Sequence, residues 1–336
     1  MSRSRMVLGG LAAVLLLSVA FLWWAVPDRQ LDPTGPHAIA TESWVLLDEG
    51  RPDRLADEAA DRRIPVQAWY PARAPRGPVV VFVHGTQGRR LAYLTWIREL
   101  ASHGYTVVAA DHPPVALFPA FPDGSSAPSS SSWSSLMGEA SDPTSFVEHP
   151  VFQLAHEVVA ADLTAMLDDL PVRLGVSTAR VVLAGHSFGG GLAVTHCDDE
   201  PRCVGMIDLD GPPFGDRDLP AVRKPLLVFL AGRTRMAAAL DAVWQPIDPM
   251  IANAAGPIWV YALPSAGHLD LSDLGLLVRP SVLRTVFPTS QIGPGSLDEK
   301  LRAVAAVSVA FVDRTLAAED VDIQAVADAY PRLERR

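Results

Sequence analysis

The segment Gly185–Gly189 reads Gly-His-Ser-Phe-Gly, which places a serine between two glycines directly after the apolar run Val181–Ala184. Between a strand and a helix, this pattern forms a sharp turn that exposes the serine hydroxyl, and the glycines let the two elements pass close together. A serine held in this way is suited to attack an acyl carbonyl. We therefore predict that Ser187 is a nucleophile and that a helix begins beside it.

A serine nucleophile needs a histidine as its base and a carboxylate that orients the histidine. In chains with this type of turn, the acid and then the histidine follow the serine. Only His196 and His268 follow Ser187 in this sequence. His196 would lie roughly 13 Å along the predicted helix, which is too far for proton transfer. His268, in a loop after a predicted strand at 258–263, is therefore the predicted base.

Two aspartates are candidates for the acid: Asp208 lies near the end of the predicted strand 204–209, and Asp210 lies at the junction of this strand with the following loop. Because side chains alternate along a strand, Asp208 and Asp210 point to the same side. Asp210 is nearer to the loop edge, so we predict that it orients His268, and Asp208 is the alternative. The next predicted strand, 226–231, has no carboxylate at its end.

Backbone N–H groups are needed to hold the negative charge that develops on the carbonyl oxygen. One belongs to Phe188, directly after the predicted nucleophile. The other is expected from Thr86, in the turn His84–Gly88 that follows an apolar strand at 79–83.

These residues require a sheet whose strands end at one common edge. Two strands at 43–47 and 64–69 are expected to pair antiparallel, and strands then alternate with helices, which indicates an α/β fold with a mostly parallel central sheet and helices on both faces. The further strands are predicted at 79–83, 105–110, 179–184, 204–209, 226–231 and 258–263, and the helices at 90–102, 152–170, from 187, and at 297–315.

Residues 112–150 interrupt the alternation with a segment rich in proline and serine that also contains Phe118, Phe121, Trp133 and Phe146. Long loops in compact domains are often lids or binding loops. Because this one follows a strand, we expect a lid-like insertion at the carboxyl edge of the sheet.

Composition limits the class of protein. The 336 residues are 49% hydrophobic, enough for one large domain, and the 28 basic and 38 acidic residues give a formal net charge of -10. This charge argues against nucleic acid as a partner and provides no basic patch for anionic lipid. The two cysteines lack clustered histidines, so no metal site is predicted.

The N-terminus is expected to direct the chain to a membrane. Arg3 and Arg5 precede an uncharged, mostly apolar segment at 6–26 that is long enough to span a bilayer. We predict that 1–26 is a membrane anchor or uncleaved signal, with the following domain exported; cleavage near Ala20 would instead release a secreted protein. Residues 27–40 are predicted to be a linker, and 321–336 a C-terminal tail.

Cys197 and Cys203 flank a five-residue polar segment. An exported protein can keep a disulfide, and closing so short a loop contributes about 2 kcal/mol in the chain-entropy model. We predict that these two cysteines are bonded.

With these motifs in place, the chain resembles the α/β-hydrolase superfamily, and within it the branch of platelet-activating-factor acetylhydrolases and bacterial lipases or cutinases. The similarity extends over roughly residues 43–315 and is sparse between the motifs, and we predict an α/β-hydrolase domain at 41–320. The segments that carry it are Ile64–Pro71, Val83–Gly88, Leu100–Tyr105, Gly185–Gly190, Leu209–Gly211 and Gly267-His268. That branch places its acid after the strand that follows the nucleophile helix, where Asp210 lies. The 112–150 region and the Asp111-His112 pair depart from its pattern.

The resemblance implies a serine hydrolase that cleaves carboxylic esters of small molecules or lipids without a metal or organic cofactor. A polyester hydrolase or an acyltransferase would share the same acyl-enzyme chemistry, and a catalytically silent protein that binds at a membrane surface is the third alternative.

Overall fold

The computed structural model describes residues 26, 29–55, 61–125, 130, 133–135, 150–212, 222–232 and 247–336. The predicted anchor at 1–26 therefore lies outside the described residues, apart from Val26. Among the helices that the structure does describe, none combines the length and the apolar character needed to cross a bilayer. Most of the predicted lid-like insertion also lies outside these ranges, at 126–129, 131–132 and 136–149.

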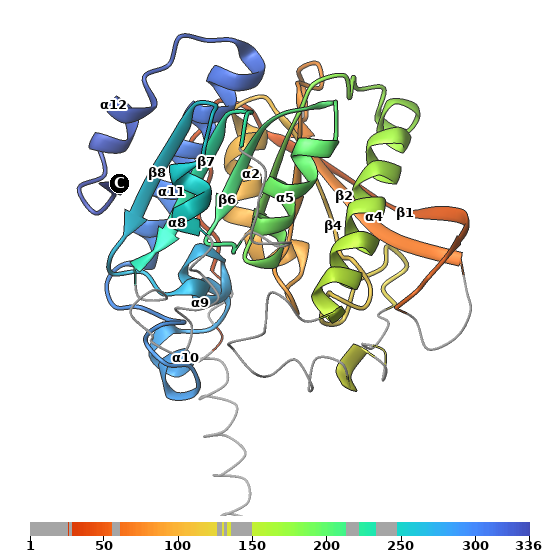
Figure 1. Cartoon of the computed structure of the whole chain (residues 1–336), viewed down its shortest axis with the longest axis horizontal. Coiled ribbons are helices and arrows are strands. Elements are labelled where there is room, and N and C mark those ends of the chain that lie inside the picture. Colours follow the sequence, from red (N-terminus) through yellow and green to blue (C-terminus); the bar gives the residue numbers. More distant parts are fainter. Residues whose placement is uncertain are drawn as a thin grey trace, which may run out of the picture.

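A nine-stranded sheet forms the centre of the molecule, in the order β1-β2-β4-β3-β5-β6-β7-β8-β9 (Figure 1). The strands from β4 to β8 are parallel to one another, while β1, β2 and β9 run antiparallel to their neighbours. This arrangement confirms the predicted mostly parallel sheet and its antiparallel N-terminal pair. The strands are β1 (Ile39–Pro52), β2 (Asp61–Pro71), β3 (Val79–Val83), β4 (Thr106–Ala110), β5 (Val181–His186), β6 (Cys203–Leu209), β7 (Leu226–Ala231), β8 (Ile258–Leu263) and β9 (Glu334–Arg335).

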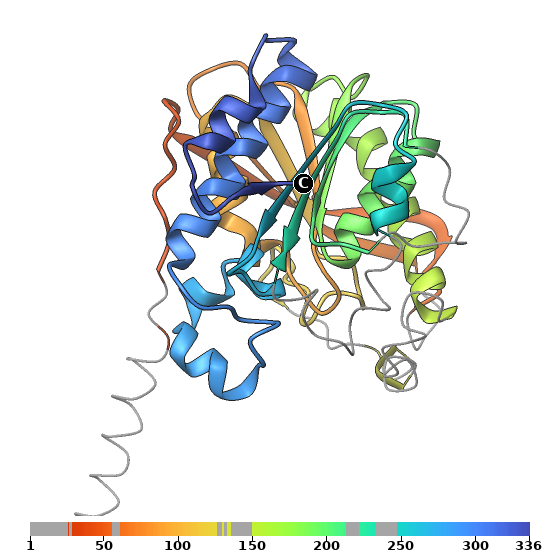
Figure 2. The same cartoon turned by 60° about the vertical axis from the view of Figure 1, so that its left-hand side comes forward.

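Helices cover both faces of the sheet (Figure 2). Side chains from α4, α5 and α8 belong to the core on one face, and those from α2, α11 and α12 to the core on the other. Strand β3 shows why both layers are needed, because Val79, Val81 and Val83 enter the first core while Val80 and Phe82 enter the second. The helices are α2 (Leu94–Ser102), α4 (Pro150–Leu174), α5 (Phe188–Asp199), α8 (Ile247–Ala252), α9 (Leu274–Leu277), α10 (Pro280–Val286), α11 (Leu297–Val312) and α12 (Ile323–Asp328).

The C-terminal segment is more ordered than the predicted tail. Ile323 and Ala327 of α12 are buried in the core, and β9 pairs with β8 at the edge of the sheet. A two-residue strand has no alternating pattern that sequence analysis can detect, so its pairing depends on the neighbouring edge.

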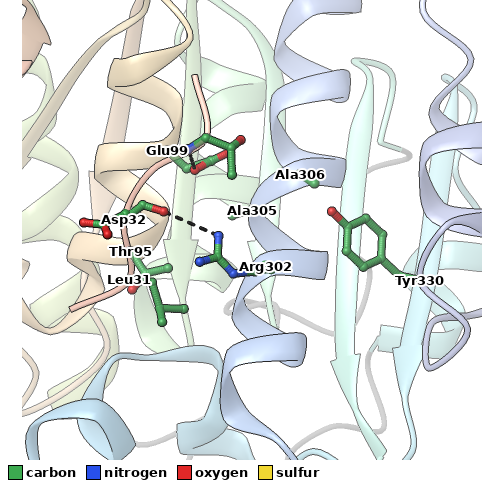
Figure 3. A pocket seen from close by; sticks show the side chains of 9 residues that line it. Leu31, Asp32, Thr95, Glu99, Arg302, Ala305, Ala306 and Tyr330 are labelled. Carbon is green, nitrogen blue, oxygen red and sulfur yellow. Dashed lines mark hydrogen bonds between the residues drawn. The ribbon is translucent and has the colours of Figure 1, made fainter. Parts of the chain in front are cut away.

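The predicted linker also packs on the domain from residue 29 onward. Leu31 is buried with Leu276, Leu297 and Leu301, and the backbone N–H of Thr34 donates to Glu99 Oε2 at 2.9 Å. Figure 3 shows this segment between α2 and α11, where a cavity of about 50 Å³ remains. That volume suits water molecules rather than an organic substrate.

The predicted disulfide is present between Cys197 and Cys203, whose Cα atoms lie 5.3 Å apart. It joins the last turn of α5 to the first residue of β6. The bond therefore ties the end of the helix that begins beside Ser187 to the strand that leads to Asp210.

Candidate active site

Ser187 occupies a sharp turn between β5 and α5. Its backbone has φ 55° and ψ −122°, a conformation that is uncommon for a residue other than glycine, and its N–H donates to the carbonyl oxygen of Leu209 at 3.0 Å. A Cβ on Gly185 would lie 2.2 Å from the backbone of Gly189, and one on Gly189 would lie 2.2 Å from the Val83 oxygen. Both glycines are therefore required by close backbone contacts, as predicted for this motif.

His268 and Asp210 form a buried pair at the same edge of the sheet. His268 Nδ1 lies 2.7 Å from Asp210 Oδ2, and Asp210 Oδ1 accepts a hydrogen bond from the Ala231 N–H at 2.9 Å. Because the carboxylate accepts a hydrogen bond from Nδ1–H, the Nε2 atom of a neutral His268 is the acceptor nitrogen of the ring, which is the atom that can act as a base. His268 and Ser187 line the same cavity, so the structure brings the three predicted residues together.

Asp208 has a different environment. Its Oδ1 accepts the Gly211 N–H at 2.7 Å, and a Cβ on Gly190 would come within 2.1 Å of this oxygen. Burial raises the pKa of Asp208 well above its usual range, with the nearby charge of Asp210 acting in the same direction and the Gly211 hydrogen bond opposing it. This shift favours the neutral form of the Asp208 carboxyl group, and it is Asp210 that bonds to the histidine.

The turn after β3 supplies the second predicted N–H donor. The N–H groups of Gly85, Gln87 and Gly88 donate to Tyr93 Oη, Val115 O and Gly85 O. In the part of the chain that the structure describes, the N–H of Thr86 donates to no protein acceptor, and Thr86 lines the cavity. Phe188 is the first residue of α5, so its N–H belongs to the positive end of that helix.

The cavity has a volume of about 890 Å³, which is within the range of small-molecule sites. Leu117 and Phe118, from the start of the 112–150 insertion, lie in its wall and are 40% and 54% exposed. The other apolar lining residues include Leu91, Leu94, Leu274, Leu277 and Phe287, and the polar ones include Gln30, Arg89, Ser272 and Gln291.

Two buried histidines lie against the turn after β3 and the Ser187 turn. His84 lies with Nδ1 2.8 Å from Gly85 O and accepts the His112 N–H on Nε2 at 3.1 Å; burial lowers its pKa to about 4, so it is neutral. His186 lies between Tyr93 and His268, with its Nδ1 2.9 Å from Tyr93 Oη. These contacts give both residues a structural role.

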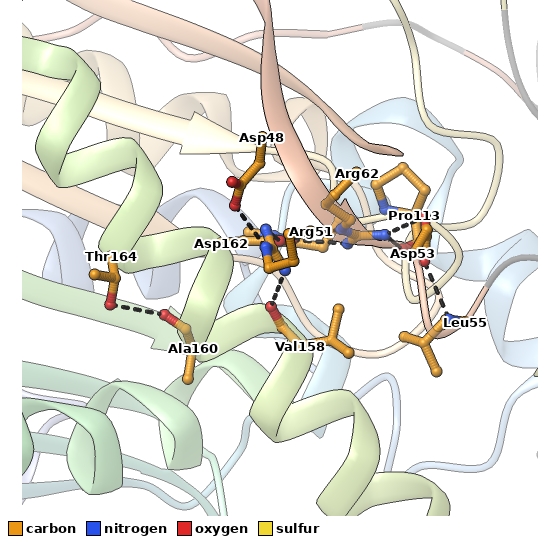
Figure 4. Close-up of polar contacts among 11 residues, drawn as sticks. Asp48, Arg51, Asp53, Leu55, Arg62, Pro113, Val158, Ala160, Asp162 and Thr164 are labelled. Carbon is orange, nitrogen blue, oxygen red and sulfur yellow. Dashed lines mark hydrogen bonds and ion pairs between the residues drawn. The ribbon is translucent and has the colours of Figure 1, made fainter. Parts of the chain in front are cut away.

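A network of buried charges behind the site was not foreseen from the sequence. Asp162 of α4 bonds to Arg62 of β2 and to His112, with its Oδ2 2.9 Å from His112 Nδ1, and Arg51 also bonds to it (Figure 4). Arg62 also donates to Pro113 O. The sequence analysis did not single out Asp162, because a charged residue in an amphipathic helix usually lies at the surface. The one feature that pointed to this region was the Asp111-His112 pair, which departs from the family pattern.

Asp111 anchors the same insertion from the other side. Its carboxylate pairs with Arg90, and Arg90 Nη2 donates to Ala120 O at 2.9 Å while the Ala120 N–H donates to Asp111 Oδ2 at 3.0 Å. The buried pairs at Asp111 and His112 therefore fix the segment that carries Leu117 and Phe118 into the cavity wall.

Within the described ranges, no group of three or more histidine, cysteine, aspartate or glutamate side chains is arranged to hold a metal ion.

Comparisons with known proteins agree with this architecture. A "Probable 1-alkyl-2-acetylglycerophosphocholine esterase" from Arthroderma benhamiae (strain ATCC MYA-4681 / CBS 112371) is 25% identical over 227 residues, 66% of this chain and 54% of that protein. The chain thus spans about half the length of this curated relative. The structure of a ferulic acid esterase from Streptomyces cinnamoneus superimposes with a TM-score of 0.72 at 23% identity, over 90% of this chain and 98% of that one.

The family model of the alpha/beta hydrolase family matches residues 80–333, which include the turn after β3, Ser187, Asp210 and His268. This match confirms the resemblance drawn from the sequence motifs at the level of the superfamily. The chain belongs to the alpha/beta hydrolase family.

Proposed function

We propose that this protein is a carboxylic ester hydrolase that forms an acyl-enzyme on Ser187. The observation that carries the proposal is the His268–Asp210 pair, 2.7 Å long, in the wall of the cavity that contains the strained Ser187 turn. The names of the two relatives, both esterases, support an ester as the substrate class.

In the first half of the reaction, Ser187 Oγ attacks the ester carbonyl carbon while its proton passes to His268 Nε2. The carbonyl oxygen becomes an oxyanion held by the N–H groups of Thr86 and Phe188. Asp210 stabilises the imidazolium that forms and keeps Nδ1 protonated. His268 then gives its proton to the departing alcohol, and the acyl group stays on Ser187.

The second half repeats these steps with water as the nucleophile. His268 Nε2 takes a proton from the water, the hydroxide attacks the acyl-enzyme carbonyl, and the proton returns to Ser187 Oγ as the acid leaves. The chain's own groups therefore balance every proton in the cycle.

The cavity favours an apolar acyl or alcohol group. Leucines and Phe287 form much of its wall, and the wide, open shape leaves space for lipid esters as well as short-chain esters. We include both within the proposed substrate class.

Direct hydrolysis tests the proposal. The full chain is assayed with p-nitrophenyl esters from acetate to long acyl chains, beside Ser187→Ala, and a fluorophosphonate probe is used to label the serine. We expect ester cleavage that falls by about a millionfold in Ser187→Ala, since removing such a nucleophile costs on that order. Equal inertness of both proteins, with no labelling of Ser187, would instead favour a silent binding protein.

We also propose that residues 1–26 anchor the protein and that the catalytic domain lies outside the cytoplasm. The chain enters the described domain beside the cavity, where the Arg29 N–H donates to Leu276 O at 3.1 Å and Gln30 lines the cavity wall. An anchor at 6–26 would thus hold the cavity close to the bilayer. Retention of the full chain in membranes washed with alkaline carbonate is the expected result, and release into the supernatant contradicts it.

A further inference from the structure

Tyr93 and His186 connect three loops of the site through one series of hydrogen bonds. The Gly85 N–H donates to Tyr93 Oη at 3.3 Å, Tyr93 Oη lies 2.9 Å from His186 Nδ1, and His186 Nε2 lies 3.0 Å from the backbone oxygen of His268. All four residues are buried. The series therefore runs from the turn that contains Thr86 to the loop that carries His268.

The chemistry of the end groups fixes where each proton lies. A backbone carbonyl only accepts, so the His268 oxygen requires the proton on His186 Nε2. Nδ1 of the neutral ring is then an acceptor, and the Tyr93 O–H must donate to it while its oxygen accepts the Gly85 N–H. Each donor in the series has one acceptor.

Burial keeps both side chains in these states. It lowers the pKa of His186 well below its usual value, with the neighbouring His268 acting in the same direction, and it raises the pKa of Tyr93. His186 is thus neutral and Tyr93 protonated at the pH where a histidine base works.

The same residues also touch the reacting groups. The His186 ring lies 4.5 Å from the His268 ring between centroids, and His186 directly precedes Ser187 in the chain. A Cβ on Gly85 would lie 3.1 Å from Ser187 Cβ, so the turn and the serine are in close contact. Small shifts in this series would change the distance from the serine to both the base and the N–H donors.

We propose that Tyr93 and His186 are positioning residues, which set the placement of Thr86 and His268 relative to Ser187 through the directed hydrogen bonds between them. The proposal rests on the proposed function, because the positioning affects the rate only if an ester is attacked by Ser187 beside these groups. A misplacement of about 1 Å at such a site can reduce the rate by about 10²-fold.

Two substitutions of His186 separate hydrogen bonding from packing. His186→Gln keeps an N–H donor near the position of Nε2, whereas His186→Phe keeps the ring volume and loses both nitrogens. We expect kcat of His186→Phe to fall about 10²-fold with a smaller change in KM, and His186→Gln to recover at least part of that loss. If His186→Phe is as active as His186→Gln or more active, the ring only packs and the proposal is wrong.

Tyr93→Phe removes one hydroxyl, with Tyr105→Phe as the matched control because the buried Tyr105 hydroxyl bonds to Asp313, away from the site. We expect a lower kcat for Tyr93→Phe alone. An unchanged kcat in Tyr93→Phe would overturn the proposal.

A readout that is independent of ester hydrolysis is the ¹⁵N NMR signal of the His186 ring in the full chain, assigned by its loss in His186→Gln. The wild type should show the neutral Nε2–H form across pH 5 to 9, with the Nδ1 signal shifted by the hydrogen bond that it accepts from Tyr93. Tyr93→Phe should keep the Nε2–H form and move the Nδ1 signal toward that of an acceptor without this bond. An Nδ1–H form in the wild type, or an Nδ1 signal that does not move in Tyr93→Phe, would contradict the inferred proton direction, even if no ester were cleaved.

Discussion

Among the described residues, two buried His–Asp pairs of nearly equal length lie in different regions, and the histidine of one of them lines the cavity that contains Ser187. His268 lies 2.7 Å from Asp210 at the carboxyl edge of the sheet, and His112 lies 2.9 Å from Asp162 between β2 and α4. The cavity that contains Ser187 is lined by His268. His112 is fully buried, with 0% exposure, against 7% for His268.

The carboxylates also differ in their partners. Asp162 bonds to Arg62 and Arg51 in addition to His112 (Figure 4). Burial alone would raise its pKa, but the charge of Arg62 and the hydrogen bonds from His112 and Arg62 outweigh this effect and hold the pKa well below its usual range. Asp162 therefore neutralises the charges of Arg62 and Arg51, so its role is structural.

The comparison teaches that a His–Asp pair does not define an active site. Proton transfer also requires a nucleophile beside the second ring nitrogen and space for a substrate. At His112, Nε2 is buried and has no hydrogen-bond partner among the described residues. We therefore expect the His268–Asp210 pair to control the rate of ester hydrolysis and the His112–Asp162 pair to control the free energy of unfolding.

The largest expected effect is on rate, in Asp210→Asn. The amide cannot hold Nδ1 protonated in the same way, so kcat for ester hydrolysis should fall by about 10⁴-fold while the fold persists. Steady-state kinetics and circular dichroism check this outcome. The matched control is Asp208→Asn, two residues earlier on the same strand, which should retain most of the activity; an Asp208→Asn loss equal to that of Asp210→Asn would transfer the role to Asp208.

The next effect is on stability, in Asp162→Asn. Removing one carboxylate of this buried cluster leaves the charge of Arg62 with Asp53 as its remaining carboxylate partner, and it should reduce the free energy of unfolding by about 3–5 kcal/mol. The folded variant should still hydrolyse esters far faster than Asp210→Asn. Urea denaturation gives the free energy.

The pH dependence of this loss has a definite sign. The pKa of Asp162 is lower in the folded protein than its unfolded value of about 3.9, so its stabilisation is present at neutral pH and is lost as the pH falls below that value. The difference between Asp162→Asn and the wild type should therefore shrink in acid. A difference that stays constant from pH 7 to pH 3 would contradict the ionised pair.

The smallest expected effect is on the stability of Asp208→Asn, and its pH dependence has the opposite sign to that of Asp162→Asn. Burial raises the folded pKa of Asp208, so its favourable contribution is present below the unfolded value of about 3.9 and is lost as the pH rises toward the folded value. An amide has no such dependence. The variant should gain stability over the wild type with rising pH, by at most about 1.4 kcal/mol per pH unit. Parallel urea titrations at pH 5 and 6 measure this gain, and an equal difference at both values would mean that Asp208 is ionised.

The sequence predicted much of the fold because its elements are strongly periodic or short and apolar. The strands at 79–83, 226–231 and 258–263 have the predicted bounds, and the helix predicted at 152–170 lies within α4. Strand β9 and the packing of residues 29–38 were missed, because each depends on contacts with distant elements rather than on local pattern.

The sequence by itself determined the Gly-x-Ser-x-Gly turn, the chain order of the serine, the candidate aspartates and His268, and the pairing of the two cysteines, because turn geometry, chain order and short loop closure are local or topological properties. Only the tertiary structure decided between Asp208 and Asp210, and only it placed Arg62 against Asp162 and Tyr93 against His186. Those choices depend on side chains from separate elements that meet after folding, where burial and the direction of each hydrogen bond select one partner over another.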